Sequence, residues 1–282
     1  MAWSPKDIPD QTGRTFVITG ANSGIGFHAA KHLVARGADV VLACRRLDAG
    51  KAAAAKLSGP GSARALHLDL EDQDSVRAFA AEAPERIDVL VNNAGIMMVP
   101  KRMSPQGIEA QWAVNVVGHA LLTRLLLDRV TDRVVTVSSI AHRKGRIEPA
   151  SWDGSDYDAW KAYGQSKLGD LMFALRLQRH LEESGSAVRS VAAHPGVSLT
   201  RLAKDIPLSI KAAMVLYVPF LQSADKGSWP TLRAATDDVA GGSYWGPRGF
   251  QEWRGPPEPA RIEPHALDED VQEAVWDAVW SA

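Results

Sequence analysis

Short apolar runs alternate with longer amphipathic stretches over about the first 195 residues of the chain. The runs are brief and rich in β-branched residues, which is typical of strands buried on both faces of a parallel sheet. They are TFVIT (15–19), DVVLAC (39–44), ALHLDL (65–70), IDVLVN (87–92), RVVTVS (133–138) and AVRSVAA (187–193). The stretches between them repeat apolar residues at helical spacing, such as Ile25, Ala29, Leu33 and Val34, and later Leu122, Leu125, Leu126 and Arg129. This order predicts an α/β fold, a single-domain, Rossmann-type doubly wound parallel sheet flanked by helices.

The pattern changes after residue 200. The stretch 201–229 mixes amphipathic character with Pro207 and Pro219. We interpret about 199–229 as a substrate loop, in which 199–222 could close as a lid. The Gly- and Pro-rich segment 244–264 predicts a loop after one short strand. The last segment, 250–282, predicts a loop and a helix whose apolar face carries Val271, Val275, Trp276, Val279 and Trp280. That face either docks on the body of the protein or forms a subunit interface.

Composition narrows the class of protein. The chain has 282 residues, 45% of them hydrophobic, and a formal net charge of −1, so no broad basic field predicts binding to nucleic acid or to an anionic membrane. The single cysteine, Cys44, excludes an internal disulfide and fits a reducing cytoplasm. We see no secretory signal, and the longest apolar segment, IKAAMVLYVPFLQ, is too short to span a bilayer. We therefore expect a cytoplasmic protein without a transmembrane segment.

The sequence TGANSGIG (19–26) lies where the first predicted strand ends and the first helix begins. Gly20 permits a tight turn, Gly24 lets the backbone approach a pyrophosphate, and Gly26 lets the helix pack closely. The helix N-terminus offers free N–H groups and a partial positive charge to phosphates. A plain loop would also use glycines, but this position between strand and helix predicts a dinucleotide site. Its contact residues would be Gly20, Asn22, Ser23, Gly24, Ile25 and Gly26.

The end of the second predicted strand indicates which dinucleotide binds. NAD sites usually carry an acidic residue there, about 20 residues after the glycines, to accept hydrogen bonds from the ribose. Here the sequence reads ACRR, with Arg45 and Arg46 in place of the acid. A guanidinium pairs with a 2′-phosphate and offers nothing specific to a bare hydroxyl. Two solvated surface arginines are the alternative, but we predict NADP(H) as the cofactor.

Five motifs now stand in order along the chain. They are TGxxxGIG from Thr19, NNAG from Asn92, VSS from Val137, YxxxK from Tyr163 and HPG from His194. The chain thereby resembles the short-chain dehydrogenase/reductase family over about residues 13–250, and its ACRR and HPGVSLT segments look most like the retinol-dehydrogenase-like branch. Protochlorophyllide reductases and the WW-domain oxidoreductase look similar. We assign residues 1–282 to one dinucleotide-binding oxidoreductase domain with its core at about 13–250.

This resemblance implies roles for individual residues. Tyr163 would be the general acid/base, Lys167 its partner, Ser139 a donor to the substrate oxygen, and Asn115 the support of a relay water. The cofactor would contact Asp69, Leu70, Asn93, Ala94, Gly95, Tyr163, Lys167, Pro195, Gly196, Val197 and Thr200. Adjacent Ser138 leaves the serine ambiguous, because side chains alternate across a strand and only one can face the site. The family pattern favours Ser139.

The chemistry explains why a tyrosine needs a lysine one helical turn away. A phenol with its ordinary pKa near 10 is poorly matched to neutral pH, and moving it there takes about 4 kcal/mol in favour of phenolate. Residues i and i+4 lie on one helix face about 6 Å apart along the axis, so the Lys167 ammonium can supply that stabilisation. Without the other motifs, Tyr163 and Lys167 would be read as an ordinary surface pair.

Other candidate sites in the sequence have weaker support. His28 and His32 have the i, i+4 spacing of a metal site, but no acidic or cysteine ligand accompanies them in sequence, and we predict no metal. The basic run His142, Arg143, Lys144 and Arg146 is interpreted as a solvated loop or as a contact for an acidic substrate tail. The alternative to an enzyme is a sensor or scaffold that binds NADP(H) without turnover. A third reading, a pigment-dependent reductase, has no residue here that demands it.

The irregular segments predict the substrate class. Met97, Met98, Trp152, Tyr157 and Trp160 precede or surround the tyrosine, and Leu199, Leu202, Met214, Leu216 and Phe220 follow it. Any one of them can be a core residue, but together they indicate a large apolar pocket. We expect a hydrophobic small-molecule carbonyl or alcohol as substrate. The helices expected at about 110–129 and 160–184 resemble those through which family members associate, and we expect a homo-oligomer.

Overall fold

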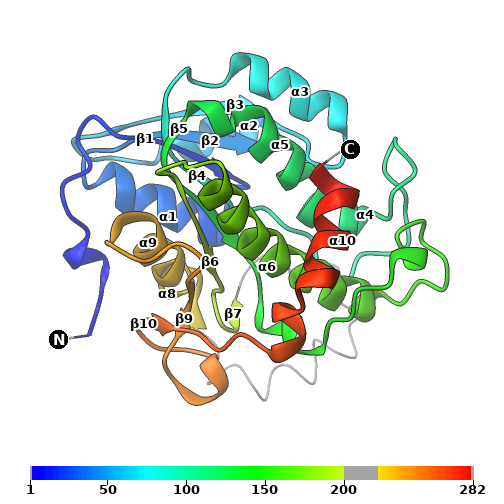
Figure 1. Cartoon of the computed structure of the whole chain (residues 1–282). Helices are drawn as coiled ribbons and strands as arrows, with labels where there is room; N and C mark the ends of the chain where they lie inside the picture. The colour runs from blue at the N-terminus through cyan, green and yellow to red at the C-terminus, as the bar shows by residue number, and fades with distance from the viewer. Residues whose placement is uncertain (1, 200–221, 281–282) are drawn as a thin grey trace.

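An eight-stranded sheet forms the centre of the protein (Figure 1). The computed structural model describes residues 2–199 and 222–280. Its strands run in the spatial order β10-β9-β6-β5-β4-β1-β2-β3. Their bounds are β1 Thr15–Thr19, β2 Asp39–Cys44, β3 Ser62–His67, β4 Ile87–Asn92, β5 Val130–Val137, β6 Arg189–Ala193, β9 Tyr244–Pro247 and β10 Pro257–Pro259. All neighbours pair in parallel except β10, which runs antiparallel to β9, so the predicted parallel sheet is confirmed.

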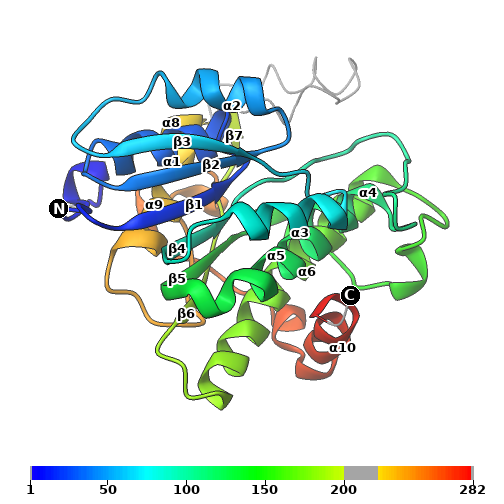
Figure 2. The same ribbon diagram turned by 90° about the horizontal axis from the view of Figure 1, so that it is seen from above.

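Helices cover both faces of this sheet, as the view from above makes clear (Figure 2). One face packs against α1 Gly24–Val34, α2 Leu47–Ala54 and α9 Trp229–Thr236, and the other against α3 Gln73–Glu82, α5 Gly118–Leu126 and α6 Ala159–Glu183. Each face has its own hydrophobic core because strands of a parallel sheet bury apolar side chains on both sides. The apolar residues predicted on the first helix, among them Ala29 and Leu33, are buried in α1.

The C-terminal helix α10, Glu269–Trp280, docks on the body of the protein. It packs against α6 and α5, with Val275 and Val279 fully buried. The ring of Trp276 stacks on Phe173 of α6 with 5.8 Å between ring centroids. Of the two alternatives for the apolar face of this helix, the structure shows docking on the body of its own chain.

Three strand predictions need correction. The third strand is β3 at Ser62–His67 and not 65–70, and its side chains are half-buried or exposed because it forms the edge of the sheet. The fifth strand begins earlier than expected, at Val130. The segment expected to be only loop after β9 contributes the further strand β10, whose short PEP sequence carries no hydrophobic signal.

Shorter elements complete the described chain. A π-helical turn, Ala113–Val117, joins α4, Ala110–Trp112, to α5. A two-stranded parallel pair, β7 Ser198–Leu199 with β8 Gln222–Ser223, precedes α8, Ala224–Gly227. None of the helices within residues 2–199 and 222–280 combines the length and the apolar character needed to cross a bilayer.

Candidate active site

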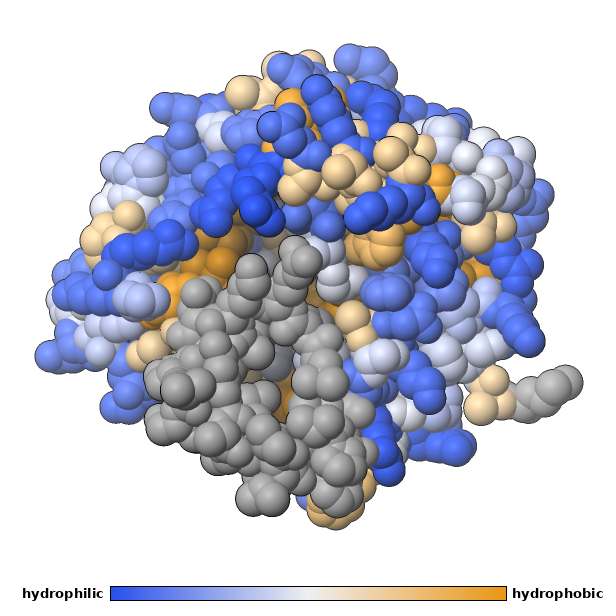
Figure 3. Space-filling model, turned by 180° about the vertical axis from the view of Figure 1, so that it is seen from behind, coloured by the Kyte–Doolittle hydropathy of each residue, from blue (hydrophilic) through white to orange (hydrophobic). Residues whose placement is uncertain are grey.

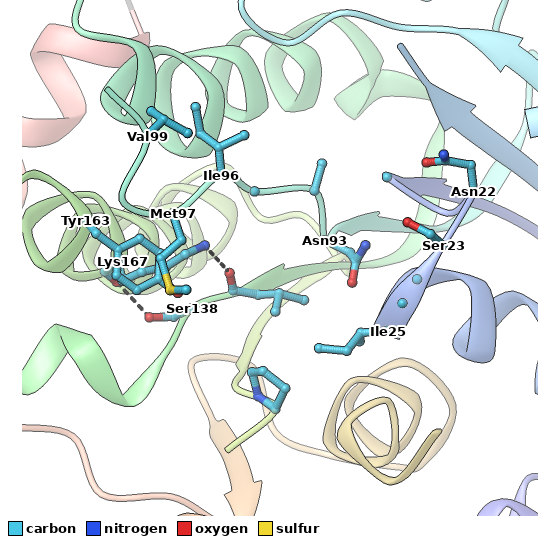
Figure 4. A pocket seen from close by; sticks show the side chains of 17 residues that line it. Asn22, Ser23, Ile25, Asn93, Ile96, Met97, Val99, Ser138, Tyr163 and Lys167 are labelled. Carbon is cyan, nitrogen blue, oxygen red and sulfur yellow. Dashed lines mark hydrogen bonds between the residues drawn. The ribbon is translucent and has the colours of Figure 1, made fainter. Parts of the chain in front are cut away.

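A cavity of about 290 Å³ opens at the carboxyl ends of the central strands. In open parallel sheets this edge, where the strand order reverses between β1 and β4, is where ligands bind. The lining residues come from the segments that follow β1, β4, β5 and β6 and from α6. Asn22 and Ser23 lie at one end of the cavity and Tyr163, Lys167 and Ser138 at the other, with Asn93 between them (Figure 4).

The glycine loop forms one wall. Gly20 has a φ of +68°, a conformation that side chains rarely adopt, and it turns the chain from β1 into α1. A Cβ on Gly26 would lie 2.5 Å from Asn93 Nδ2, so only glycine lets α1 approach the segment after β4. The α1 N-cap, Ser23, makes no side-chain capping bond among the described residues, so the first N–H groups of the helix face the cavity without that partner.

The threonine that ends β1 fixes the second wall. Its hydroxyl oxygen accepts from the backbone N–H groups of Asn93 at 2.9 Å and Ala94 at 2.8 Å. Both lone pairs of Thr19 are then used, so its O–H is the donor, and His119 Nε2 at 2.9 Å is a nearer acceptor than Val91 O at 3.4 Å. His119 is buried, and burial lowers its pKa to about 3, so the ring stays neutral with its proton on Nδ1. His119 was not singled out from the sequence.

Asn115 lies in the π-helical turn, one layer behind the cavity. Its side-chain oxygen accepts from Ile96 N at 2.9 Å, and its amide donates to Ile96 O at 3.1 Å and to Ser166 Oγ at 2.8 Å. Its backbone carbonyl accepts from His119 Nδ1 at 2.8 Å. The side chain therefore holds the segment after β4 against α6, and support of a water through its carbonyl stays a prediction.

Tyr163 and Lys167 project from one face of α6 into the cavity (Figure 4). Both are buried, with 8% and 5% of their surface exposed. The Lys167 ammonium donates to Val137 O at 3.0 Å and to Asp170 Oδ2 at 2.7 Å. A Cβ on Gly95 would lie 3.5 Å from Lys167 Nζ, so the glycine keeps space open beside the ammonium.

The two adjacent serines differ in what their hydroxyls do. Ser138 is buried beside the cavity, and its O–H donates to Lys167 O at 2.6 Å. Ser139 is half-buried and caps the 3₁₀ helix Ile140–Lys144, where its oxygen accepts from Ala141 N at 3.2 Å. Within the described part of the chain we find no acceptor for the Ser139 proton. Ser138 lines the cavity, but its proton is donated to Lys167 O; Ser139 is not among the lining residues, and among the described residues its proton has no such acceptor.

Asp170, a residue that the sequence analysis passed over, completes this end of the site. Its side chain is almost fully buried and pairs with Lys167. Burial raises the pKa of the Asp170 carboxyl to about 7, although the nearby ammonium opposes the rise. Burial alone would lower the pKa of Lys167, but the charges of Asp170 and Tyr163 outweigh it, and the ammonium stays protonated. The only sequence signal was an acid three residues after the lysine.

Of the remaining predicted cofactor residues, only Pro195 is among those that line this cavity within the described part of the chain. Arg45 and Arg46 are exposed after β2, and Arg45 Nη1 is 3.8 Å from the carboxylate of Glu71. Asp69 and Leu70 follow β3, where Asp69 Oδ1 accepts from Glu71 N and Leu70 packs on α5. Among the residues after β6, Pro195 lines the cavity and Gly196 and Val197 lie directly beyond it. Thr200 lies outside the described residues.

The predicted substrate residues divide into two groups. Met97 lines the cavity together with Ile96 and Val99. Trp152 instead stacks on Trp112 at 4.5 Å, and Tyr157 donates to Val99 O, so both have structural roles.

Met98 takes a φ of 52° and donates from its backbone to Gln111, so it too is held in the scaffold. Trp160 is 48% exposed, with its ring 6.1 Å from that of Tyr163. Leu199 is described only through its backbone, and Leu202, Met214, Leu216 and Phe220 lie outside the described residues. The face seen in Figure 3 is mostly hydrophilic where it is described, with hydrophobic patches between the polar side chains.

Two interpretations of charged clusters change. An acid does accompany the histidine pair, because Asp225 Oδ1 lies 2.7 Å from His32 Nε2 and 3.3 Å from His28 Nδ1. Even so, no set of three or more His, Cys, Asp or Glu side chains that could hold a metal ion is found among the described residues.

The basic run after Ser139 is not a solvated loop throughout. His142 is fully buried, and Arg143 pairs with Glu252 at 2.7 Å. These side chains hold the loop after β9 and so support the segment that follows β6, where His194 Nε2 lies 2.9 Å from the same carboxylate.

Comparison with known proteins agrees with this arrangement. A sequence model described as short chain dehydrogenase matches residues 14–210. Retinol dehydrogenase 13 of Homo sapiens is 41% identical over 204 residues, which are 68% of this chain and 61% of that protein. Retinol dehydrogenase 12 of Mus musculus is 38% identical over 234 residues, 79% of this chain and 73% of that protein. The chain thus spans about three fifths of the length of the human relative.

A solved structure matches the whole chain. The crystal structure of an uncharacterized protein from Mycobacterium paratuberculosis superposes with a TM-score of 0.87 at 42% identity, covering 100% of this chain and 97% of that one. The family match, the sheet order and the cavity at the strand ends all point the same way. The chain belongs to the short chain dehydrogenase family, and within it to the retinol-dehydrogenase-like branch.

Proposed function

We propose that the protein is an NADP(H)-dependent oxidoreductase that transfers a hydride between the nicotinamide and a hydrophobic carbonyl or alcohol. One observation carries this proposal. Tyr163 and Lys167 reach one end of a cavity whose other end is the glycine loop at the α1 N-terminus. A redox site of this family needs both ends, one to hold the phosphates and one to move a proton.

The cradle fits a dinucleotide. Gly20 and Gly26 remove side chains where a Cβ would clash, and the α1 N-terminus presents backbone N–H groups to the cavity. Such a terminus with its dipole is a favourable place for a pyrophosphate. When bound, NADP(H) supplies or accepts the hydride, and the protein supplies orientation and the proton. Arg45 and Arg46, exposed at the end of β2, support the preference for a 2′-phosphate.

The protein's part in the reaction is proton transfer and charge stabilisation. In reduction the Tyr163 hydroxyl would donate its proton to the substrate oxygen, and in oxidation the phenolate would accept one. The Lys167 ammonium stabilises the phenolate because both are buried and share a face of α6. The free hydroxyl proton of Ser139 would donate to the same substrate oxygen as negative charge develops there.

The walls beside Tyr163 support an apolar substrate. Ile96, Met97 and Val99 line the cavity, and the exposed ring of Trp160 lies next to the tyrosine. The retinol dehydrogenases among the relatives act on an apolar alcohol by name, which supports the same class here.

The free, buried Cys44 supports a cytoplasmic location. The homo-oligomer remains a proposal, and α10 already covers part of the surface of α5 and α6.

Tyr163→Phe tests the proposal. We expect the variant to lose turnover by at least about 100-fold, because general acid–base catalysis contributes about 10²–10⁴-fold. NADPH binding should change little. Turnover is measured as NADPH oxidation with a panel of apolar aldehydes, ketones and quinones, and binding by nucleotide fluorescence.

Tyr157→Phe is the matched control, because Tyr157 is not among the residues that line the cavity; its hydroxyl only holds the backbone of Val99, and the variant should keep most of its activity. Substantial turnover by Tyr163→Phe would remove the phenol from the mechanism. NADPH binding with no turnover of any panel member by the wild type would favour the sensor or scaffold alternative.

A further inference from the structure

Asp170 is a buried acid that the proposed chemistry does not use. It lies three residues after Lys167 on α6 and is 2% exposed. Its Oδ2 accepts from the Lys167 ammonium at 2.7 Å, while Val137 O accepts a second N–H of the same ammonium. The ammonium of Lys167 thus contacts Asp170 as well as lining the cavity beside Tyr163.

The charges of Tyr163, Lys167 and Asp170 do not cancel in every protonation state of these three side chains. Tyr163 and Asp170 are two acids that share a single cation, Lys167, in a site with almost no exposure. With both acids ionised, one buried negative charge has no partner, which is costly in a region of low dielectric. Ionisation of either acid therefore opposes ionisation of the other, and the two titrate as a coupled pair.

We propose, as an extension of the function proposed above, that Asp170 is a positioning residue that sets the charge felt by the Tyr163–Lys167 pair. When Asp170 is ionised, it neutralises Lys167 and favours the phenol form of Tyr163. When Asp170 holds a proton, the ammonium acts on Tyr163 alone and favours phenolate. The reacting proton moves only between Tyr163 Oη and the substrate oxygen, and Asp170 changes how readily it moves.

Other buried titratable side chains lie near this cluster. On other elements, the charge of Lys167 acts on His119 of α5 and that of Asp170 acts on Tyr244 of β9, and the rings of His142 and His194 lie against Tyr244. Burial lowers the pKa of His119 to about 3 and of His142 to about 4, lowers that of His194 below 6.5 and raises that of Tyr244 above 10. Burial raises the pKa of Asp170 to about 7, which separates it from His119, His142 and Tyr244.

The geometry of α6 gives the size of the effect. Seven positions separate Tyr163 from Asp170, which is roughly 10 Å along a helix axis. A unit charge at roughly 10 Å in a protein-like dielectric of ~20 changes an ionisation equilibrium by roughly tenfold. Removing the carboxylate should therefore move the ionisation of Tyr163 by about one pH unit toward acid.

Asp170→Asn tests this in alcohol oxidation, where the phenolate form is needed. The amide oxygen still accepts from Lys167, but the negative charge is gone at every pH. We expect the rising limb of the kcat profile to move by about one unit to lower pH, giving about tenfold higher kcat on the limb. KM for NADP and the thermal midpoint should change little, because the hydrogen bond to the ammonium remains.

Two further variants separate charge from structure. Asp170→Glu restores the carboxylate and should return the limb toward the wild-type position. Glu183→Gln removes an exposed carboxylate from the end of the same helix and should leave the profile unchanged. A limb for Asp170→Asn that stays at the wild-type pH or moves to higher pH overturns the proposal.

A second measurement works even where the variant does not fold. In wild-type protein labelled with [13Cγ]-aspartate, one carboxyl resonance should titrate with a midpoint near pH 7, and its absence between pH 6 and 8 overturns the proposal. A [13Cζ]-tyrosine label reports the ionisation of Tyr163 directly and needs no substrate. If Tyr163→Phe keeps full turnover, the proposed function fails, and these resonances still decide whether the two acids are coupled.

Discussion

Replacing the arginines after β2 should convert the cofactor preference. Arg45 and Arg46 are exposed at the carboxyl edge of the sheet, and the guanidinium of Arg46 has no ion pair within the described residues. Arg45 is 3.8 Å from the carboxylate of Glu71, which also pairs with Arg102 at the shorter distance of 2.8 Å. The ion pair between Arg45 and Glu71 is therefore weak. Both side chains are therefore available to a 2′-phosphate.

The magnitude follows from this exposure. A hydrogen bond to a charged group is worth about 1.5–3 kcal/mol. The Arg45 side chain is 58% exposed, so solvent screening places its contribution at the lower end, and each arginine should account for about 1.5 kcal/mol. Since 1.4 kcal/mol is about tenfold, Arg45→Ala with Arg46→Ala should lower kcat/KM for NADPH by up to about 100-fold. The value for NADH should change by less than about twofold, because it has no phosphate at this position.

The assay compares kcat/KM for NADPH and NADH with one substrate, at low and at moderate salt. The advantage of NADPH should shrink as salt rises, since the ion pairs are exposed. Arg248→Ala is the matched control, because Arg248 is 60% exposed and pairs with Glu258 at 3.2 Å, away from the cavity. Equal losses with both cofactors, or no loss with NADPH, would refute the assignment of these arginines.

Two further predictions concern stability. Trp276→Ala removes a buried ring stacked on Phe173, and we expect the free energy of unfolding, measured with urea, to fall by about 3–5 kcal/mol. The control Asp277→Ala changes an exposed residue of the same helix and should cost less than about 0.5 kcal/mol. Equal urea midpoints for the two variants would mean that α10 is not part of the cooperative core. Burial alone would raise the pKa of Asp88, but hydrogen bonds from Thr15 N and other donors outweigh it and the pKa is lowered. Its stabilisation is thus present above the unfolded pKa of about 3.9 and lost as pH falls through the lower folded value. The stability gap between wild type and Asp88→Asn should therefore narrow below about pH 4, and a gap that widens there contradicts this.

Much of the fold follows from local pattern. The first, second and fourth strands lie at the predicted residues, 15–19, 39–44 and 87–92, because strands buried on both faces are apolar at most of their positions. The edge strand β3 escapes this rule because one of its sides faces solvent, and the prediction was displaced by three residues. Strand β10 could not be found at all, because its place depends only on pairing with β9, far from any hydrophobic signal of its own.

The glycine loop, Tyr163 and Lys167 could be located from the sequence because each has a fixed spacing that its chemistry requires. His119 and Asp170 could not, since an isolated polar residue in an apolar helix looks the same whether it faces solvent, a ligand or another buried group. The difference between Ser138 and Ser139 likewise needed the position of Lys167 O, which takes the proton of the first serine, and the role of Ser139 stays a prediction. Local sequence fixes which residues can form strands, turns and helix faces, whereas the partner of a buried polar group is set by packing between segments distant in the chain, and only the tertiary structure shows it.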